Sequence, residues 1–403
     1  MSERDAGRNS DITDLRAEWS LPDGVIYLNH GSFGLSPRCV QQARREWSER
    51  LEAEPMDFFL RQLEDRLDEA CRRLGAFVGA RGDDLLFVDN ATVGMNIVAA
   101  NTDLESGDEV LCTDQEYGAV LRIWRRVCSD RGARLVVRPL PQPLASAEQV
   151  VETFLDGVTS RTRLIVVSHV TSPTAVTLPI EQICTGAKAR GVPVCVDGPH
   201  ALAMLPVDLK RIDCDYYTAS CHKWLCGPFG SGFLYVAGRH KQGLKPIATS
   251  WGRSLVGRAA HWKDEFRWSG TRDPAPYLAV SAAIDFLEVH GLAAFRHTTH
   301  ELASYAAGRI SELTGIAPLV PETGSWFGSM IALPLPASEE PPPKPGQTDP
   351  LQNLLWQRFR IEVPIIHWKG ERLLRVSCHL YNRREDIDRL VEALGQLLET
   401  EST

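Results

Sequence analysis

Short apolar runs alternate with amphipathic segments between about residues 83 and 236. The runs that predict strands are Leu85–Val88, Glu109–Thr113, Arg134–Arg138, Leu164–Ser168, Pro193–Asp197, Tyr216–Ala219 and Gly232–Val236. Between them, apolar positions recur at three- and four-residue spacing, which predicts helices at Tyr117–Cys128, Glu148–Leu155 and Ile180–Arg190. Because this alternation is typical of helices packed on a mostly parallel sheet, the segment is predicted to form one large α/β unit.

The pattern changes after Pro274. Longer helices are predicted at Ala275–Val289 and Leu292–Leu313, then strands near Ser329–Leu335 and Leu373–Ser377, and a final helix at Arg384–Leu398. The proline-rich stretch Pro334–Pro350 is interpreted as an exposed loop. We therefore expect an N-terminal segment (1–22), a large domain (23–280) and a smaller C-terminal α+β domain (281–403).

Composition narrows the class of protein. The 403-residue chain has a formal net charge of −8, which disfavours binding to nucleic acid. Its apolar runs are too short to span a bilayer, and Met1 to Ser20 is polar, so a cytoplasmic protein is expected. The ten cysteines are scattered and form no C-x-x-C pair, so we expect reduced core residues and no metal site.

Polar residues with possible chemistry follow three of the predicted strands. Thr92 lies where a helix begins, and its hydroxyl with the unpaired amides there would suit a phosphate, although a capped turn without a ligand explains the same pattern. Asp197 ends a second strand, at the sheet edge where ligands bind, or it caps a turn. Lys223 follows a third strand in an apolar setting that would lower its pKa and make the amine nucleophilic, although most lysines are simply solvated.

In combination, these residues match what pyridoxal phosphate (PLP) requires. The phosphate tethers the cofactor, a lysine forms the Schiff base, and a carboxylate keeps the pyridine nitrogen protonated so that the ring can accept electrons. The order phosphate site, aspartate, lysine within one α/β unit therefore predicts a PLP site.

The sequence also resembles the class V aminotransferase family of fold-type I PLP-dependent enzymes. The resemblance runs from about Tyr27 to Leu390 and rests on Asn90-Ala91-Thr92, Asp197-Gly198-x-His200, Ser220-x-His222-Lys223-x-x-x-Gly227-Pro228, Ser269-Gly270-Thr271-Arg272-Asp273, and Arg375-Val376-Ser377 through Tyr381-Asn382. It is closest to the isopenicillin N epimerase-like subgroup at Asn29–Gly34, His169–Thr174 and Ile361–Pro364.

The resemblance implies a role for each matching position. Lys223 would be the catalytic Schiff-base lysine, and Asp197 would contact the pyridine nitrogen. The implied phosphate contacts are Thr92, the Val93 amide, Ser220 and His222, while His200 and Ser172 would lie near the ring hydroxyl. Tyr117 would stack on the cofactor ring, unless it is an ordinary aromatic residue at a helix start. Thr271 would reach the phosphate of the neighbouring subunit's cofactor, which implies a homodimer with active sites at the subunit interface.

Three further residues would contact the substrate. Arg375 matches an arginine that binds the substrate's α-carboxylate, for which a guanidinium fork is suited, although a lone strand arginine is more often a surface charge. Asn29 and His30 would line the substrate entrance, or form a glycine-rich turn with a polar cap.

The expected function is PLP-dependent chemistry at the α-carbon of an amino acid or an amino-acid-derived substrate, of the isopenicillin N epimerase-like type. The alternative is a β-eliminating C–S lyase for a cysteine conjugate. A non-catalytic binding protein is less favoured, because it needs none of Lys223, Asp197 and Arg375. Cysteine desulfurase activity is disfavoured, since it needs a mobile cysteine before the carboxylate-binding arginine and none occurs between Cys226 and Cys378.

Overall fold

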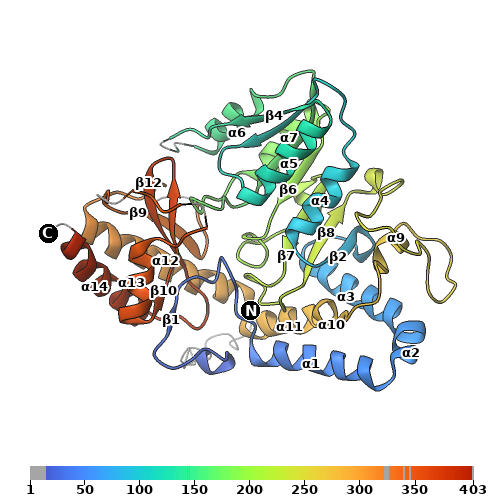
Figure 1. The fold of residues 1–403 in the computed structure, drawn as a ribbon, viewed down its shortest axis with the longest axis horizontal. Coiled ribbons are helices and arrows are strands. Elements are labelled where there is room, and N and C mark those ends of the chain that lie inside the picture. Colours follow the sequence, from blue (N-terminus) through green and yellow to red (C-terminus); the bar gives the residue numbers. More distant parts are fainter. Residues whose placement is uncertain are drawn as a thin grey trace, which may run out of the picture.

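The computed structural model describes residues 15–142, 144, 146–321, 326–338, 341–344 and 346–401. Its centre is a seven-stranded sheet in the order β2-β8-β7-β6-β5-β3-β4 (Figure 1). The strands are β2 (Leu85–Val88), β3 (Glu109–Thr113), β4 (Arg134–Arg138), β5 (Thr162–Ser168), β6 (Val194–Asp197), β7 (Tyr216–Ser220) and β8 (Gly232–Val236). The pairings from β7 through β4 are parallel, and β8 is antiparallel to both of its neighbours. The predicted α/β class with a mostly parallel sheet is confirmed.

The middle of this sheet is covered on both faces. Ile165, Val166 and Val167 of β5 are fully buried, as expected for a parallel strand between two layers of helices. The connecting helices are α4 (Ala91–Asn101), α5 (Gly118–Asp130), α6 (Ala147–Leu155), α7 (Ile180–Ala189) and α8 (Leu209–Ile212). All predicted strands and helices of this unit occur within about two residues of their expected bounds.

A second group of helices lies below the sheet in Figure 1, with α9 to its right. It contains α1 (Arg38–Ala53), α2 (Pro55–Asp57), α3 (Leu63–Phe77), α9 (Asp264–Arg267), α10 (Ala275–Leu278) and α11 (Val280–His290). The helix predicted over 275–289 is interrupted at Ala279, where α10 ends. Helices α1 to α3 were not predicted, although Leu63, Leu67 and Leu74 have helical spacing and are buried.

The C-terminal region forms a smaller antiparallel sheet with its own helices. Its strand order is β11-β12-β9, formed by β11 (Ile365–Trp368), β12 (Glu371–Ser377) and β9 (Met330–Pro334). The accompanying helices are α12 (Leu292–Thr314), α13 (Pro350–Phe359) and α14 (Arg384–Glu401). A short parallel pair joins β1 (Ile26–Tyr27) to β10 (Ile361–Glu362), so the N-terminal chain lies against the C-terminal region. The predicted α+β pattern is confirmed, whereas the domain limits at 22 and 280 remain a prediction.

The interpretation of 334–350 as an exposed loop holds only in its middle. Residues 339, 340 and 345 lie outside the described residues. At the two ends, Leu335 and Asp349 are buried, and the Asp349 carboxylate accepts a hydrogen bond from Leu351 N at 2.8 Å at the start of α13. Because of its proline content, the whole stretch was interpreted as a loop, and the helix cap at Asp349 was not predicted.

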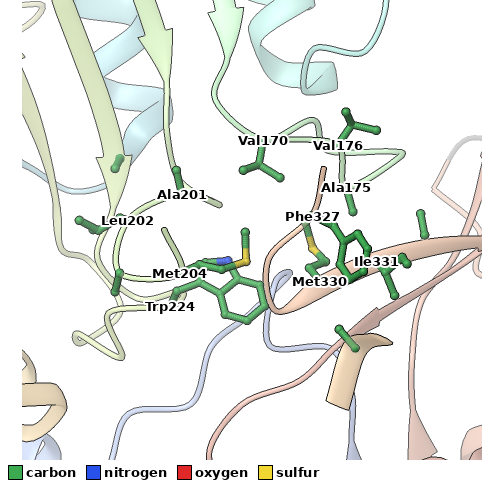
Figure 2. Close-up of a cluster of buried hydrophobic side chains, with 14 of the residues drawn as sticks. Val170, Ala175, Val176, Ala201, Leu202, Met204, Trp224, Phe327, Met330 and Ile331 are labelled. Atoms are coloured by element: carbon green, nitrogen blue, oxygen red, sulfur yellow. The ribbon is translucent and has the colours of Figure 1, made fainter. Parts of the chain in front are cut away.

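An apolar cluster joins the loops of the large sheet to β9 (Figure 2). Trp224, next to Lys223 in sequence, and Met204 lie on the large-sheet side, and Met330 and Ile331 of β9 lie opposite them. All four side chains are at most 2% exposed. Because one continuous core spans the two sheets, the segment that carries Lys223 is held in place by both of them.

Two further expectations concern the chain as a whole. All ten cysteines are free, and nine are buried as expected, whereas Cys39 is exposed. Within the described ranges, no single helix is long and apolar enough to cross a membrane; the pair Ala275–His290 and Leu292–Thr314, bent by 78°, passes that test jointly on length and composition.

Candidate active site

The carboxyl ends of the central strands meet the small sheet at a cavity of about 320 Å³. Its lining residues are Ser32, Phe33, Asn90, Ala91, Thr92, Tyr117, Val120, Ser168, Val170, Ser172, Asp197, Pro199, His200, Ser220, His222, Lys223 and Arg375. A larger groove of about 570 Å³ runs along α1 beside Pro228 and Phe229, but none of the predicted site residues lines it. Size alone therefore does not identify the site, whereas the chemistry of the smaller cavity does.

Lys223 and Asp197 lie in this cavity at the ends of adjacent strands. Burial, reinforced by the charge of Arg375, lowers the pKa of Lys223 to about 7, and Asp197 opposes this shift. Burial also raises the pKa of Asp197 to about 7, against the effect of Lys223. A substantial fraction of Lys223 is therefore an uncharged, nucleophilic amine at neutral pH.

His200 and Arg375 complete the polar wall around the lysine. His200 Nε2 lies 3.2 Å from Lys223 Nζ, and burial followed by the charges of Lys223 and Arg375 holds the pKa of His200 well below its usual range. Arg375 donates to the Ser172 carbonyl at 2.6 Å and to Ser32 Oγ at 2.7 Å. Burial lowers the pKa of Arg375 only to about 10, so it stays cationic and its fork is fixed in orientation.

The opposite end of the cavity contains the predicted phosphate residues. Thr92 is exposed on the cavity wall, and Ser220 Oγ accepts a hydrogen bond from Ala91 N at 3.0 Å. The Val93 amide is already engaged, because it donates to the Asn90 side chain at 3.1 Å as a helix cap. His222 lies beside them, with its Nδ1 buried and without a partner among the described residues.

Tyr117 and Thr271 have different positions. Tyr117 is the residue before α5, 51% exposed, and it lines the cavity. Thr271 is exposed and does not line the cavity. It precedes Arg272, which pairs with Asp89 at 2.9 Å next to the phosphate end. The structure therefore places Thr271 near the site but outside it.

Asn29 and His30 do not lie on the cavity wall. The Asn29 amide donates to Glu362 at 3.2 Å. His30 is fully buried, and its Nε2 lies 3.0 Å from the Lys223 carbonyl oxygen. Because a carbonyl only accepts, Nε2 carries the proton, and Nδ1 accepts from the Tyr381 hydroxyl at 2.8 Å. Their expected position at the substrate entrance does not agree with this burial; His30 instead supports the backbone of Lys223.

Three residues near the site were missed by the sequence analysis. Ser32 binds Arg375, and Gly34 packs so closely that a Cβ there would lie 2.3 Å from the His222 carbonyl and 2.7 Å from the Lys223 carbonyl. Glu116 is buried, and burial raises its pKa to about 7. The glycine in Asn29–Gly34 was a usable signal, because a glycine with an ordinary φ is favoured where two backbones approach closely.

Among the described residues, His30, Cys226 and His379 form the one group with metal-ligand spacing. The Cys226 sulfur lies 3.7 Å from His30 Nε2 and 3.4 Å from His379 Nε2. The two imidazole rings, however, are stacked 4.1 Å apart at 22°. Because an imidazole lone pair lies in the ring plane, stacked rings cannot both point at one ion. The geometry therefore favours a packed cluster under Lys223.

The cavity fits the PLP cofactor that the sequence predicts. The Asp197 carboxylate is 6% exposed and receives no hydrogen bond from the described residues, so it can accept one from a protonated ring nitrogen. Lys223 offers an amine, and Arg375 Nε is a buried donor without a partner in the described part of the chain. These free groups match the needs of a cofactor and of a carboxylate substrate.

Comparison with known proteins agrees with this geometry. Residues 26–339 match the family described as "Aminotransferase class-V". The chain belongs to the class V aminotransferase family. It is 39% identical to isopenicillin N epimerase of Amycolatopsis lactamdurans over 95% of this chain and 98% of that enzyme. It is 28% identical to a probable L-cysteine desulfhydrase of Arabidopsis thaliana, over 96% of this chain and 86% of that protein.

A solved structure shows the same fold. The cysteine desulfurase of Thermococcus onnurineus NA1 aligns with a TM-score of 0.80 at 21% identity, over 96% of this chain and 98% of that chain. This class V protein is accordingly a PLP-dependent enzyme of fold type I that acts at the α-carbon of an amino acid or amino-acid-derived substrate. The non-catalytic alternative is set aside.

Proposed function

We propose that this class V enzyme is an epimerase, which inverts the α-carbon of isopenicillin N or of a related compound with a free amino acid group. The observation that carries the proposal is the 39% identity to the Amycolatopsis lactamdurans isopenicillin N epimerase over nearly the full length of both chains. The cavity supports it, because it combines an amine base with a fixed guanidinium.

In this proposal, Lys223 and Asp197 bind the reactive end of PLP. When bound, PLP withdraws electrons and so stabilises negative charge at the substrate's α-carbon. The uncharged Nζ of Lys223 would hold the reactive end of the cofactor, and the same amine would remove the α-proton of the substrate. His200, 3.2 Å from Nζ, orients that amine, and Asp197 holds the ring nitrogen in its protonated form.

The phosphate would be held at the start of α4. We assign it to the Thr92 hydroxyl, Ser220 and His222, whose buried Nδ1 has no described partner. The Val93 amide would join them only if the phosphate replaced the Asn90 cap. This assignment uses the positive end of the α4 dipole as well as the side chains.

Arg375 would bind the substrate's α-carboxylate. Two of its nitrogens are held by the Ser172 carbonyl and Ser32 Oγ, which fixes the plane of the guanidinium, and the group lines the cavity. A charge-assisted pair in this partly desolvated place orients the α-carbon relative to Lys223. Ser172 would therefore act through Arg375, and we also assign it a contact with the ring hydroxyl, because it lines the cavity.

We further propose a cytoplasmic homodimer. Phe33 (63% exposed), Phe229 (47%) and Trp251 (62%) are large apolar side chains on the surface, and Phe33 lines the cavity mouth. We assign Thr271, which is exposed and lies outside the cavity, to a contact with the phosphate of the neighbouring subunit's cofactor. The ten free cysteines favour a reducing compartment, and the net charge of −8 disfavours nucleic acid as a partner.

The test is proton NMR of the PLP-loaded enzyme in deuterated water, with isopenicillin N, a panel of free amino acids and cysteine conjugates. Epimerisation is expected to remove the α-proton signal while the carbon skeleton stays intact, and chiral chromatography is expected to show both epimers. A keto acid with a released sulfur fragment would instead establish the C–S lyase suggested by the 28% identity to the Arabidopsis thaliana desulfhydrase.

A further inference from the structure

We propose that Tyr117 is the second acid–base residue of the epimerisation and exchanges a proton with the α-carbon from the side opposite Lys223. The inference rests on the proposed function. Inversion removes a proton from one side of the α-carbon and returns one to the other, so an enzyme with two fixed proton carriers needs one on each side.

The order of the strands puts Tyr117 and Lys223 on opposite walls of the cavity. Lys223 follows β7 and Tyr117 follows β3, with β6 and β5 between them. Because neighbouring strands lie about 4.8 Å apart, the ends of β7 and β3 are roughly 14 Å apart. Both side chains nevertheless line the same cavity, so they reach into it from its two sides.

The turn that carries Tyr117 is fixed by buried hydrogen bonds. Glu116, directly before it, accepts from Thr113 Oγ1 at 2.6 Å and from Ser168 Oγ at 2.5 Å. Gln115 accepts a hydrogen bond from Thr174. A turn anchored at two consecutive buried side chains presents the next residue in a defined position.

The same network links the turn of Tyr117 to Arg375. Thr174 belongs to the loop in which the Ser172 carbonyl binds Arg375. The proximity of Tyr117 also partly opposes the fall in the pKa of Arg375 that burial causes. Because Arg375 is the proposed carboxylate-binding residue, a hydroxyl coupled to it lies on the side of the cavity where the α-carbon would be bound.

Other titratable groups on the described cavity wall do not occupy this side. His200 is 3.2 Å from Lys223 Nζ and belongs to the lysine's wall. His222 is adjacent to Lys223 in sequence and lies beside Phe229, with ring centroids 5.3 Å apart and ring planes tilted by 36°. Asp197 ends β6, between the two walls, and is assigned to the ring nitrogen. Tyr117 remains as the proton carrier across the cavity.

The proposed reaction involves only proton transfers, so it needs no oxidant and no further reactant. Lys223 Nζ takes the α-proton as the C–H bond breaks, and Tyr117 Oη gives its proton to the α-carbon as a new C–H bond forms. The resulting tyrosinate takes a proton from water, which the 51% exposure of Tyr117 allows, and the lysine ammonium returns its proton to water. The reverse reaction uses the same groups in exchanged roles.

The experiment compares the PLP-loaded wild type with Tyr117→Phe, which keeps the ring and removes the hydroxyl. Each epimer of the substrate is incubated separately in deuterated water. For one epimer, Tyr117→Phe is expected to exchange the α-proton for deuterium within about threefold of the wild-type rate, with retention of configuration. For the other epimer, exchange is expected to fall by about 10²-fold or more, together with epimerisation.

PLP binding distinguishes a proton-transfer role of Tyr117 from a structural one, because a structural role would change PLP binding in Tyr117→Phe. The visible absorption and dissociation constant of PLP are expected to be unaltered in Tyr117→Phe. Tyr235→Phe, in β8 and away from the cavity, is the matched control and should exchange both epimers at the wild-type rate. Three results for Tyr117→Phe would each overturn the inference: epimerisation within threefold of the wild-type rate, an equal loss of exchange for both epimers, or a loss of PLP binding. If wild type itself forms no epimer, the proposed function fails first.

Discussion

Replacing Lys223 by methionine should stabilise the cofactor-free protein at neutral pH. An ordinary lysine has a pKa of 10.5, whereas burial and Arg375 lower that of Lys223 to about 7. At 1.36 kcal/mol for each pKa unit, this difference corresponds to about 5 kcal/mol of unfavourable interaction with the protonated form. Methionine keeps an unbranched side chain that is one atom shorter, and it removes the charge. Since Lys223 also lowers the pKa of Asp197, part of the gain is lost, and we expect about 2–4 kcal/mol.

The stability difference between Lys223→Met and the wild type should depend on pH. Between pH 7 and 10.5 the unfolded wild type holds a proton on Lys223 that the folded protein has released, so the wild type becomes more stable as pH rises. The advantage of Lys223→Met is therefore largest at pH 7 and below, and it shrinks towards pH 10.5. Urea unfolding of both cofactor-free proteins with reductant, from pH 7 to pH 10, measures it.

A matched control separates the effect of burial from that of lysine chemistry. Lys210 is solvent-exposed, and Lys210→Met is expected to change stability by no more than about 0.5 kcal/mol at any pH in this range. If Lys223→Met is no more stable than wild type at pH 7, or if its advantage does not change with pH, the desolvation of Lys223 is refuted.

Three other substitutions test separate parts of the site. Arg375→Lys loses the planar guanidinium fork, so steady-state kinetics should show a KM for substrate raised by about 10- to 150-fold, and PLP titration should show a PLP affinity within twofold of wild type. An unchanged KM would contradict the assignment of Arg375 to the substrate carboxylate. Asp197→Asn cannot balance a protonated ring nitrogen and should lower kcat by roughly 10- to 100-fold while PLP remains bound, and full activity would count against its role. Gly34→Ala places a Cβ 2.7 Å from the Lys223 carbonyl, so it should lower the free energy of unfolding by about 1–3 kcal/mol and weaken PLP binding. In the control Gly308→Ala, the added Cβ meets nothing within 4 Å, so stability should be unchanged or higher. Equal effects of the two variants in urea unfolding would refute the steric argument.

The large sheet could be predicted from the sequence because each buried strand is a short apolar run with polar residues at its carboxyl end. The same logic places Asp197 and Lys223 at one edge of the sheet, and both line the cavity there, since parallel strands end at one edge. Helix α3 could have been found from the spacing of Leu63, Leu67 and Leu74, which is helical.

The surroundings of Lys223 could not be predicted in this way. His30 lies 193 positions before Lys223, and Ser32 lies 343 positions before Arg375, so no local pattern marks either contact. The resemblance implies a phosphate contact for the Val93 amide, but the Asn90 side chain accepts the hydrogen bond of that amide. Local propensity identifies the strand ends, and only the fold decides which distant groups they meet.

The loop from Asn29 to Gly34 links the two halves of the site. His30 donates to the Lys223 carbonyl, Ser32 accepts from Arg375, and Gly34 allows the loop to approach the backbone of Lys223. The relative position of the proposed proton-abstracting amine and the proposed carboxylate-binding guanidinium is therefore set by a segment that contributes only Ser32 and Phe33 to the cavity wall. A displacement of this loop would change the distance between base and substrate, so its packing contributes to the alignment on which proton transfer depends.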